Sequence, residues 1–86
     1  MRRVLFFDAF ASPEEVAQES VASLRSTPGV RSVEVFSAVD GAPRYCAMLD
    51  TDDAHDAEVQ QRITALLNEY AGYISNVSHR VLRRIG

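Results

Sequence analysis

The chain has 86 residues, of which 47% are hydrophobic and 24% charged, and carries a formal net charge of −3 at pH 7. A chain of this size forms a single domain, 1–86, which buries roughly 60–65% of its unfolded surface and has little stability to spare unless it associates. The composition excludes a disordered chain, and the mild negative charge argues against a nucleic-acid-binding module, because such modules carry a basic face.

The first strand is predicted over 2–10, where β-branched and aromatic residues are concentrated. Alternate side chains of a strand point to opposite faces, and both faces of this one are largely apolar apart from Asp8. The motif SPEE that follows predicts a helix start. Ser12 is the expected N-cap, Pro13 the first helical residue, and Glu15 completes a capping box.

The first helix is expected to bury one stripe, formed by Val16, Ser20, Val21 and Leu24. It ends at STPG, where Pro28 and Gly29 stop it. A strand over 30–39 follows, and a hairpin turn at Asp40-Gly41 leads into a returning strand over 44–49.

A second helix begins at DTDDAHDAE, with Asp52 or Asp53 available as its cap. Its apolar stripe is the clearest periodic signal in the chain: Val59, Ile63, Leu66, Leu67 and Tyr70. Gly72 is expected to close this helix. A last strand over 75–85 completes the order β-α-β-β-α-β.

This order of elements predicts a ferredoxin-like α+β sandwich, a four-stranded antiparallel sheet of order 4-1-3-2 with two helices on one face. Two helices cover only one face of such a sheet. The other face would then leave an aromatic and sulfur-rich surface in water, which is typical of an interface or a ligand cleft. We therefore expect a homodimer that pairs the uncovered faces. The alternatives are a monomer with a partly exposed aromatic face and a complex with a different protein.

Taken together, the first strand, the segment SPEEVAQESVASLRSTPGVRSVEVF, the turn DGAPRYCAML, an amphipathic helix and a basic last strand resemble the small dimeric α+β barrel proteins. The most specific piece is L-x-x-x-PGV at 24–30. This superfamily pairs two ferredoxin-like sheets face to face and includes antibiotic-biosynthesis monooxygenases, EthD-like proteins and small cyclase or lyase relatives. The resemblance implies a protein that binds or transforms a hydrophobic or aromatic, polyketide-like small molecule. An enzyme of this kind would be a cofactor-independent monooxygenase, cyclase or lyase.

The chain is also similar to the effector-binding domain of the Lrp/AsnC regulators, without their helix-turn-helix domain. That resemblance implies a non-catalytic effector-binding or oligomerisation module. A third interpretation is an accessory subunit whose exposed sheet face binds another protein.

Several kinds of chemistry are excluded by missing residues. All nine basic residues are arginine, so the chain has no side-chain amine for a Schiff base and no P-loop lysine. A single cysteine, Cys46, excludes an internal disulfide, a CxxC pair and a cysteine-rich zinc site. The acidic residues around His55 lie at a helix start, where the helix dipole favours them, and their spacing differs from an EF-hand. With no glycine-rich phosphate loop either, we predict no nucleotide cofactor and no metal.

Candidate catalytic residues come from the first, third and last strands. Matching the centres of the first and last strands sets Asp8 opposite Ser78 or His79, although a slip of one residue would change the face. If Asp8 meets His79, the carboxylate orients the imidazole, which then serves as an acid or base near neutral pH. The alternative is that Asp8 ends the buried part of the strand and meets water or Arg80. Tyr45 is the expected hydrogen-bond donor to a substrate oxygen.

Phe6, Phe10 and Met48 are predicted to form apolar walls of the cleft, although core and dimer contacts explain them equally well. Four arginines are expected to meet at one end of the sheet, where they either bind an anion or keep an edge strand from pairing wrongly: Arg2, Arg3, Arg83 and Arg84.

No stretch approaches the roughly 18–20 apolar residues of a membrane span. Arg2 and Arg3 lead into a strand-like stretch without a small-residue cleavage site, unlike a secretory signal. We therefore expect a cytoplasmic protein without membrane or nucleic-acid partners.

Overall fold

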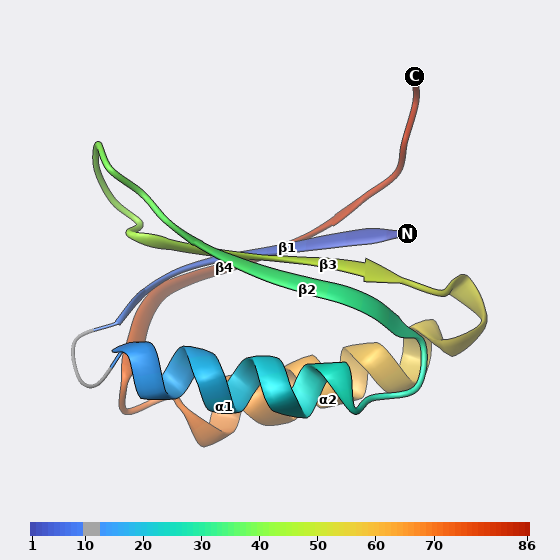
Figure 1. Ribbon diagram of the computed structural model, residues 1–86, viewed down its shortest axis with the longest axis horizontal. Helices are drawn as coiled ribbons and strands as arrows, with labels where there is room; N and C mark the ends of the chain where they lie inside the picture. Colours follow the sequence, from blue (N-terminus) through green and yellow to red (C-terminus); the bar gives the residue numbers. More distant parts are fainter. Residues whose placement is uncertain (10–12) are drawn as a thin grey trace.

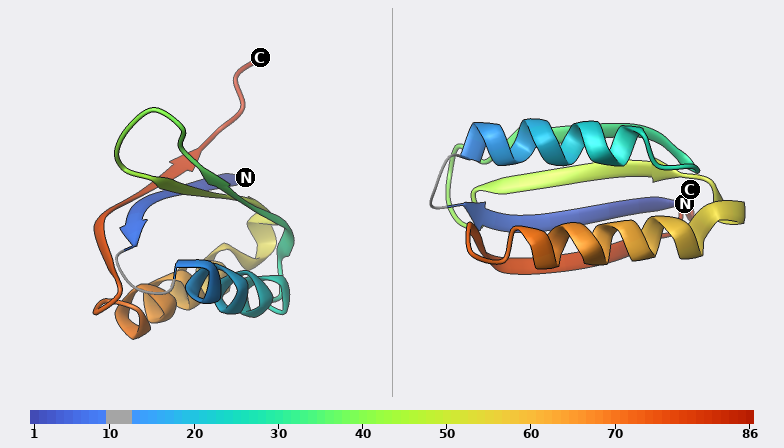
Figure 2. Two further views of the ribbon diagram at one scale, coloured as in Figure 1. Left: turned by 60° about the vertical axis from the view of Figure 1, so that its left-hand side comes forward. Right: turned by 90° about the horizontal axis from the view of Figure 1, so that it is seen from below.

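A four-stranded antiparallel sheet and two helices form the two layers of the computed structural model, which describes residues 1–9 and 13–86. The strands are β1 (Arg2–Ala9), β2 (Val30–Ser37), β3 (Tyr45–Thr51) and β4 (Ile74–Leu82), in the order β2-β3-β1-β4. Helices α1 (Pro13–Arg25) and α2 (Asp56–Glu69) both lie on one face of the sheet (Figure 1). Seen from the helix side, α1 covers the β2 half and α2 the β4 half (Figure 2). The predicted α+β sandwich and its strand order are confirmed.

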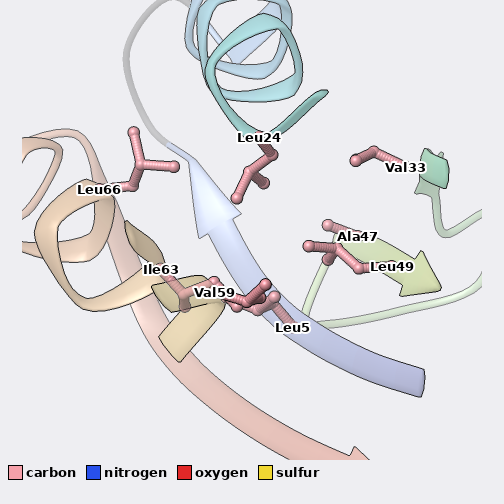
Figure 3. Close-up of a cluster of buried hydrophobic side chains, with 8 residues drawn as sticks. All are labelled: Leu5, Leu24, Val33, Ala47, Leu49, Val59, Ile63 and Leu66. Atoms are coloured by element: carbon pink, nitrogen blue, oxygen red, sulfur yellow. The ribbon is translucent and has the colours of Figure 1, made fainter. Parts of the chain in front are cut away.

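The hydrophobic core lies between the helices and the sheet (Figure 3). Its most deeply buried members are Leu49 and Val59, both 0% exposed, and Ile63 at 1%. The cluster combines one residue of α1 with residues of three strands and of α2: Leu5, Leu24, Val33, Ala47, Leu49, Val59, Ile63 and Leu66. The apolar stripe predicted on the second helix is therefore the stripe that packs on the sheet, because its 3.6-residue period places those side chains on one side.

Both helices start close to where their capping signals predict. The first helix begins at Pro13, the expected first helical residue, while its expected N-cap Ser12 lies outside the described residues. The carboxylate of Asp52 accepts a hydrogen bond from the backbone N–H of Ala54 at 2.9 Å. Asp52 thereby caps a short 3-10 helix, Asp53–His55, that leads directly into α2.

Several boundaries differ from the prediction. The turn at Asp40-Gly41 belongs to a longer connection, because β2 ends at Ser37 and β3 begins at Tyr45. The second helix ends at Glu69 instead of Gly72, since Tyr70 already leaves helical geometry at φ −99°, ψ 13°. The last strand ends at Leu82, and the exposed residues after it pair with no strand among those described.

The PGV turn between α1 and β2 packs against the start of the second helical segment. Gly29 has φ +90°, a backbone conformation that side chains disfavour, and a Cβ there would collide with the Cβ of His55. The carbonyl of Gly29 also accepts a hydrogen bond from the backbone N–H of Asp52 at 2.7 Å. A glycine is required here by both the turn and the close approach.

The sheet face away from the helices carries apolar side chains, as the two-faced pattern of β1 predicts. Strand register places Val4, Phe6, Phe36, Cys46 and Met48 on this face, which we call the outer face. Phe6 is 37% and Phe36 47% exposed. The loop between β2 and β3 and the C-terminal residues project to the same side (Figure 1). Among the described helices, none combines the length and apolar character needed to cross a bilayer.

Candidate functional site

An apolar cavity of about 60 Å³ lies between the helices and the sheet. Strands, α1 and α2 all contribute to its wall, which includes Leu5, Phe7, Val16, Val35, Ile63 and Leu67. In the part of the chain that the structure describes, no charged side chain lines this cavity, and Ser20 and Tyr70 supply the polar side-chain atoms of the wall. Such a lining favours a hydrophobic ligand, and the volume means that a ring-sized ligand must push the helices apart.

Tyr70 connects the two helices beside this cavity. Its hydroxyl donates a hydrogen bond to Oε2 of Glu19 on α1 at 2.7 Å, and its ring packs edge-on against Tyr73 with centroids 6.3 Å apart. The bond to Glu19 is the main cause that raises the pKa of Tyr70 to about 12, so the hydroxyl stays protonated at neutral pH. The sequence offers Tyr70 as one of three possible tyrosine donors, but its place in the helix stripe favoured a core role. Its position at the end of that stripe was the available signal for this second role.

Tyr45, the predicted hydrogen-bond donor, stands behind the cavity wall. Strand register pairs it with Phe7, and the two rings stack with centroids 5.6 Å apart and an interplanar angle of 23°. Phe7 lines the cavity, so Tyr45 supports that wall. Of the predicted cleft walls, Phe6 and Met48 lie on the outer face, and Phe10 lies outside the described residues.

The predicted pairing of Asp8 with His79 is wrong. Asp8 lies opposite Ser75, and His79 lies opposite Leu5 on the helix-facing side. The strand centres were misplaced because β4 spans Ile74–Leu82 instead of 75–85, and a bulge in β4 between the partners of Phe6 and Asp8 shifts the register further.

Asp8 instead joins the loop before β3 to the β4 bulge. Its carboxylate accepts hydrogen bonds from the side-chain amide of Asn76 at 2.9 Å and from the backbone N–H of Arg44 at 2.7 Å. The bond from Asn76, then that from Arg44, lowers the pKa of Asp8. The alternative prediction, in which Asp8 meets water or Arg80, is therefore not needed to explain an acidic residue in this strand. Asp8 anchors a bulge in which Asn76 has the unusual φ of +52°.

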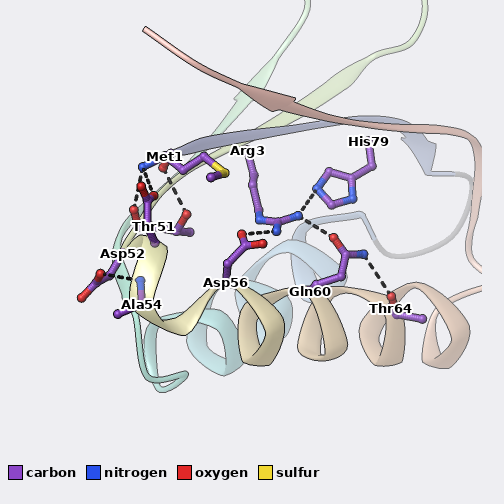
Figure 4. Close-up of polar contacts among 10 residues, drawn as sticks. Met1, Arg3, Thr51, Asp52, Ala54, Asp56, Gln60, Thr64 and His79 are labelled. Atoms are coloured by element: carbon purple, nitrogen blue, oxygen red, sulfur yellow. Dashed lines mark hydrogen bonds and ion pairs between the residues drawn. The ribbon is translucent and has the colours of Figure 1, made fainter.

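The prediction that Arg3 joins Arg2, Arg83 and Arg84 at one end of the sheet is wrong. Arg3 shares a face with Leu5 and is only 1% exposed. Its Nη2 donates to Asp56 Oδ1 at 2.5 Å, and its Nη1 donates to Gln60 Oε1 at 2.6 Å and lies 3.1 Å from His79 Nε2. Figure 4 shows Arg3 and His79 reaching from the sheet toward Asp56 and Gln60 on α2. We call these four residues the Arg3 cluster.

Two patterns in the sequence could have predicted the Arg3 cluster. Arg3 occupies the same alternating positions as Leu5 and Phe7, so its strand turns it toward the helices. Asp56 and Gln60 are four residues apart on a helix and therefore lie on one side of it. The basic end of the sheet consequently has three of the four expected arginines, and Arg2, Arg83 and Arg84 line an open hollow there.

His79 is half-buried in this cluster. Burial and then the charge of Arg3 lower the pKa of His79, while the opposing charge of Asp56 raises it less. The imidazole is therefore neutral at pH 7. Its strand partner Leu5 lines the cavity, so His79 is next to a cavity residue, although it is not itself among the described lining residues and does not lie beside Asp8.

Comparison with known proteins finds similarity in structure but not in sequence. No family model matches the chain, and no curated protein matches its sequence significantly. A DABB family protein with a ferredoxin-like fold from Mesorhizobium loti superposes with a TM-score of 0.80 at 12% identity, covering 99% of this chain and 96% of that one. An antibiotic biosynthesis monooxygenase superposes with a TM-score of 0.68 at 17% identity over 100% of both chains.

The fold is that of the antibiotic biosynthesis monooxygenases and DABB proteins. A variant of SnoaB, a cofactor-independent oxygenase from Streptomyces nogalater, shares this monooxygenase-like fold with a TM-score of 0.71 at 15% identity, covering 98% of this chain and 93% of that one. The ferredoxin-like fold that the resemblance implied is confirmed. Because one fold hosts many chemistries, the function of this chain has to be argued from its own site.

Proposed function

We propose that this chain binds a hydrophobic or aromatic small molecule in the cavity between its helices and sheet, and acts on it without a metal or nucleotide cofactor. The observation that carries the proposal is the cavity itself, with its almost wholly apolar wall. The monooxygenase-like fold adds support, since its members include a protein described as a cofactor-independent oxygenase. The absence of a phosphate loop and of lysine from the sequence agrees with it.

The position of the cavity favours this proposal over a non-catalytic effector module. An effector domain that works through assembly would hold its ligand between protomers, whereas this cavity is lined by the elements of one chain. Ser20 and Tyr70 are the polar side chains of the wall, and His79 lies beside the lining residue Leu5 in the strand register. We propose that His79 meets the polar atom of a ligand that widens the cavity past Leu5. Tyr45 acts more remotely, through the ring of Phe7.

A ligand-induced thermal shift tests this proposal, with 1-naphthol as the probe. A ligand that binds the folded state alone raises the melting temperature in proportion to the logarithm of its concentration. We expect such a rise for the wild-type protein. Ala17 lines the cavity, so Ala17→Leu should fill it and abolish the rise. Ala22 is exposed on the same helix, so Ala22→Leu is the matched control and should retain the rise.

Circular dichroism of each variant checks that the leucine is accommodated, since overpacking a core costs about 1–3 kcal/mol. If millimolar 1-naphthol leaves the wild-type melting temperature unchanged, or if Ala17→Leu responds as fully as Ala22→Leu, the ligand does not bind in this cavity and the proposal is wrong.

We further propose that two copies pair through their outer faces. Phe6 and Phe36 leave large apolar surfaces in water on this face, next to Cys46. The charges flanking them are complementary. Across the sheet, Glu34 of β2, Met48 of β3, Val4 of β1 and Arg80 of β4 lie side by side, so an acidic and a basic residue stand at the two edges of this face. A two-fold axis parallel to the strands places β2 of one copy opposite β4 of its partner. Glu34 of each copy then faces an arginine, Arg80, of the other.

A further inference from the structure

The Arg3 cluster contains a guanidinium that cannot turn away from His79. The side chain of Arg3 is 2% exposed, and α2 holds it from one side through Asp56 and Gln60. The charged and polar groups that face His79 are thus Arg3 from β1 and Asp56 and Gln60 from α2. All of the Arg3 contacts in the cluster are made by its two terminal nitrogens.

Arginine has five N–H donors and no acceptor. The 3.1 Å contact between Arg3 Nη1 and His79 Nε2 is therefore a hydrogen bond only if Nε2 has no proton and accepts. The other neutral tautomer and the imidazolium would both turn an N–H of the ring against an N–H of the guanidinium. We infer that Arg3 holds His79 in the neutral tautomer with its proton on Nδ1, so that His79 offers a hydrogen-bond donor to an oxygen of the ligand.

This assignment changes the chemistry expected of the site. A histidine oriented by a carboxylate accepts a proton easily, whereas a histidine oriented by Arg3 has its accepting nitrogen occupied. Among the contacts of the described residues, Nδ1 of His79 has no hydrogen-bond partner. The preferred ligand is then a hydrophobic molecule with a carbonyl or phenolic oxygen, which Nδ1–H can stabilise as negative charge develops on it. Arg3 is the positioning residue, and it acts through His79.

The tautomer is measured directly by long-range proton–nitrogen correlation NMR on uniformly ¹⁵N-labelled protein, since a protonated and a bare ring nitrogen differ widely in shift. His55→Gln assigns the signals by leaving His79 as the only histidine. We expect the Nδ1–H form at pH 7.5 in wild type and in Arg3→Lys, because lysine also only donates. Arg3→Gln should shift the population toward Nε2–H, since the amide can accept.

Gln60→Ala provides a second variant if Arg3→Gln does not fold. It leaves Arg3 in place and removes one competing acceptor, so the Nδ1–H form should persist. A wild-type spectrum with the proton on Nε2, or an equal mixture of the two forms, overturns the assignment.

The donor role of His79 rests on the proposed function and has its own test. Naphthalene and 1-naphthol differ only in the hydroxyl oxygen. We expect His79→Phe to weaken 1-naphthol binding about fivefold, the value of one ordinary hydrogen bond, and to leave naphthalene binding within about twofold. If neither compound binds wild type, the proposed function fails and the tautomer result stands alone. If both bind but His79→Phe weakens neither, the cavity proposal survives and the donor role is overturned.

Discussion

A buried arginine needs acceptors for its N–H groups, and the two terminal nitrogens of Arg3 meet an acid, an amide and an imidazole. The Nε–H of Arg3 is buried and has no partner among the described residues. Only the acid supplies charge of the opposite sign. Because Arg3 lies on β1 and its acid on α2, this contact also ties the helix layer to the centre of the sheet. The same residue thus serves packing and sets the chemistry of His79.

Asp56→Asn should destabilise the protein by about 1.5–3 kcal/mol, the range for a hydrogen bond to a charged group. The substitution keeps the shape of the side chain but removes the charge that faces the guanidinium. The side chain of Asp56 is 42% exposed, so water screens the pair and the loss stays below that of a fully buried one. Urea unfolding at one protein concentration measures it. Glu58→Gln is the control, because Glu58 is exposed on the same helix and makes no ion pair among the described residues, and it should change stability by less than about 0.5 kcal/mol.

Stability should fall as the pH drops below about 6.5, the ordinary pKa of histidine. The pKa of His79 is lowered in the folded state, so the unfolded chain takes up a proton that the folded chain refuses. The contribution is complete above pH 6.5 and is lost as the pH approaches the folded pKa. The lowered pKa values of Asp8 and Asp52 act only in more acidic solution, below their ordinary 3.8. Melting temperatures from pH 8 to 5 should decline less in His79→Gln than in wild type, and equal slopes would contradict the assignment.

At the scale of elements, the packing of α1, β2 and the start of α2 depends on one short turn. Gly29 lies where the three meet, under the Cβ of His55 and within a hydrogen bond of Asp52. The two helices otherwise approach each other sparsely, with the bond between Glu19 and Tyr70 as a polar link. Because few contacts join α1 and α2, we expect the cavity to widen between the helices when a ligand binds.

Gly29→Ala should destabilise the protein by more than about 1 kcal/mol, because it combines a disfavoured positive φ with a collision against His55. Gly72→Ala is the matched control, since a Cβ at Gly72 meets nothing within 4 Å. Thermal and urea unfolding of both variants measure the difference. A loss of similar size in the two proteins would show that the turn does not depend on glycine.

For the molecule as a whole, the uncovered sheet face is the feature that most affects stability and association. A chain of 86 residues has a small core, and its outer face leaves two phenylalanines in water. Association through that face would bury both side chains and place the two sheets of a dimer between two helix layers. The loop between β2 and β3 and the C-terminal residues flank the same face, where they would contact a second copy (Figure 1).

Phe36→Asp should convert a dimer into a monomer in size-exclusion chromatography with light scattering, because it places a charge inside the apolar interface. Gln61→Asp, on the exposed side of α2, should leave the mass unchanged. The strand pairing across the interface has its own test. Glu34→Arg alone should weaken the dimer by apposing it to the partner's Arg80, and adding Arg80→Glu should restore it. A monomeric wild-type protein at micromolar concentration would refute the dimer proposal.

The sequence by itself determined the elements and their order, because those signals are local. Pro13 and Asp52 mark helix starts, and the PGV turn ends the first helix where a glycine is sterically required. The stripe through Val59 and Ile63 predicted which side of α2 would be buried. Alternation along β1 placed apolar residues on both faces, and the structure shows both.

Only the tertiary structure decided which side chains meet across the fold. The β4 bulge at Asn76 and the early end of that strand set the register, so Asp8 and His79 lie on opposite faces. The partners of Arg3 come from 53 to 76 residues away along the chain. Such contacts depend on a register that one extra residue alters, whereas helix periods and turns depend on neighbours in sequence. The histidine was therefore foreseeable as a candidate, but its partner, and hence its chemistry, was not.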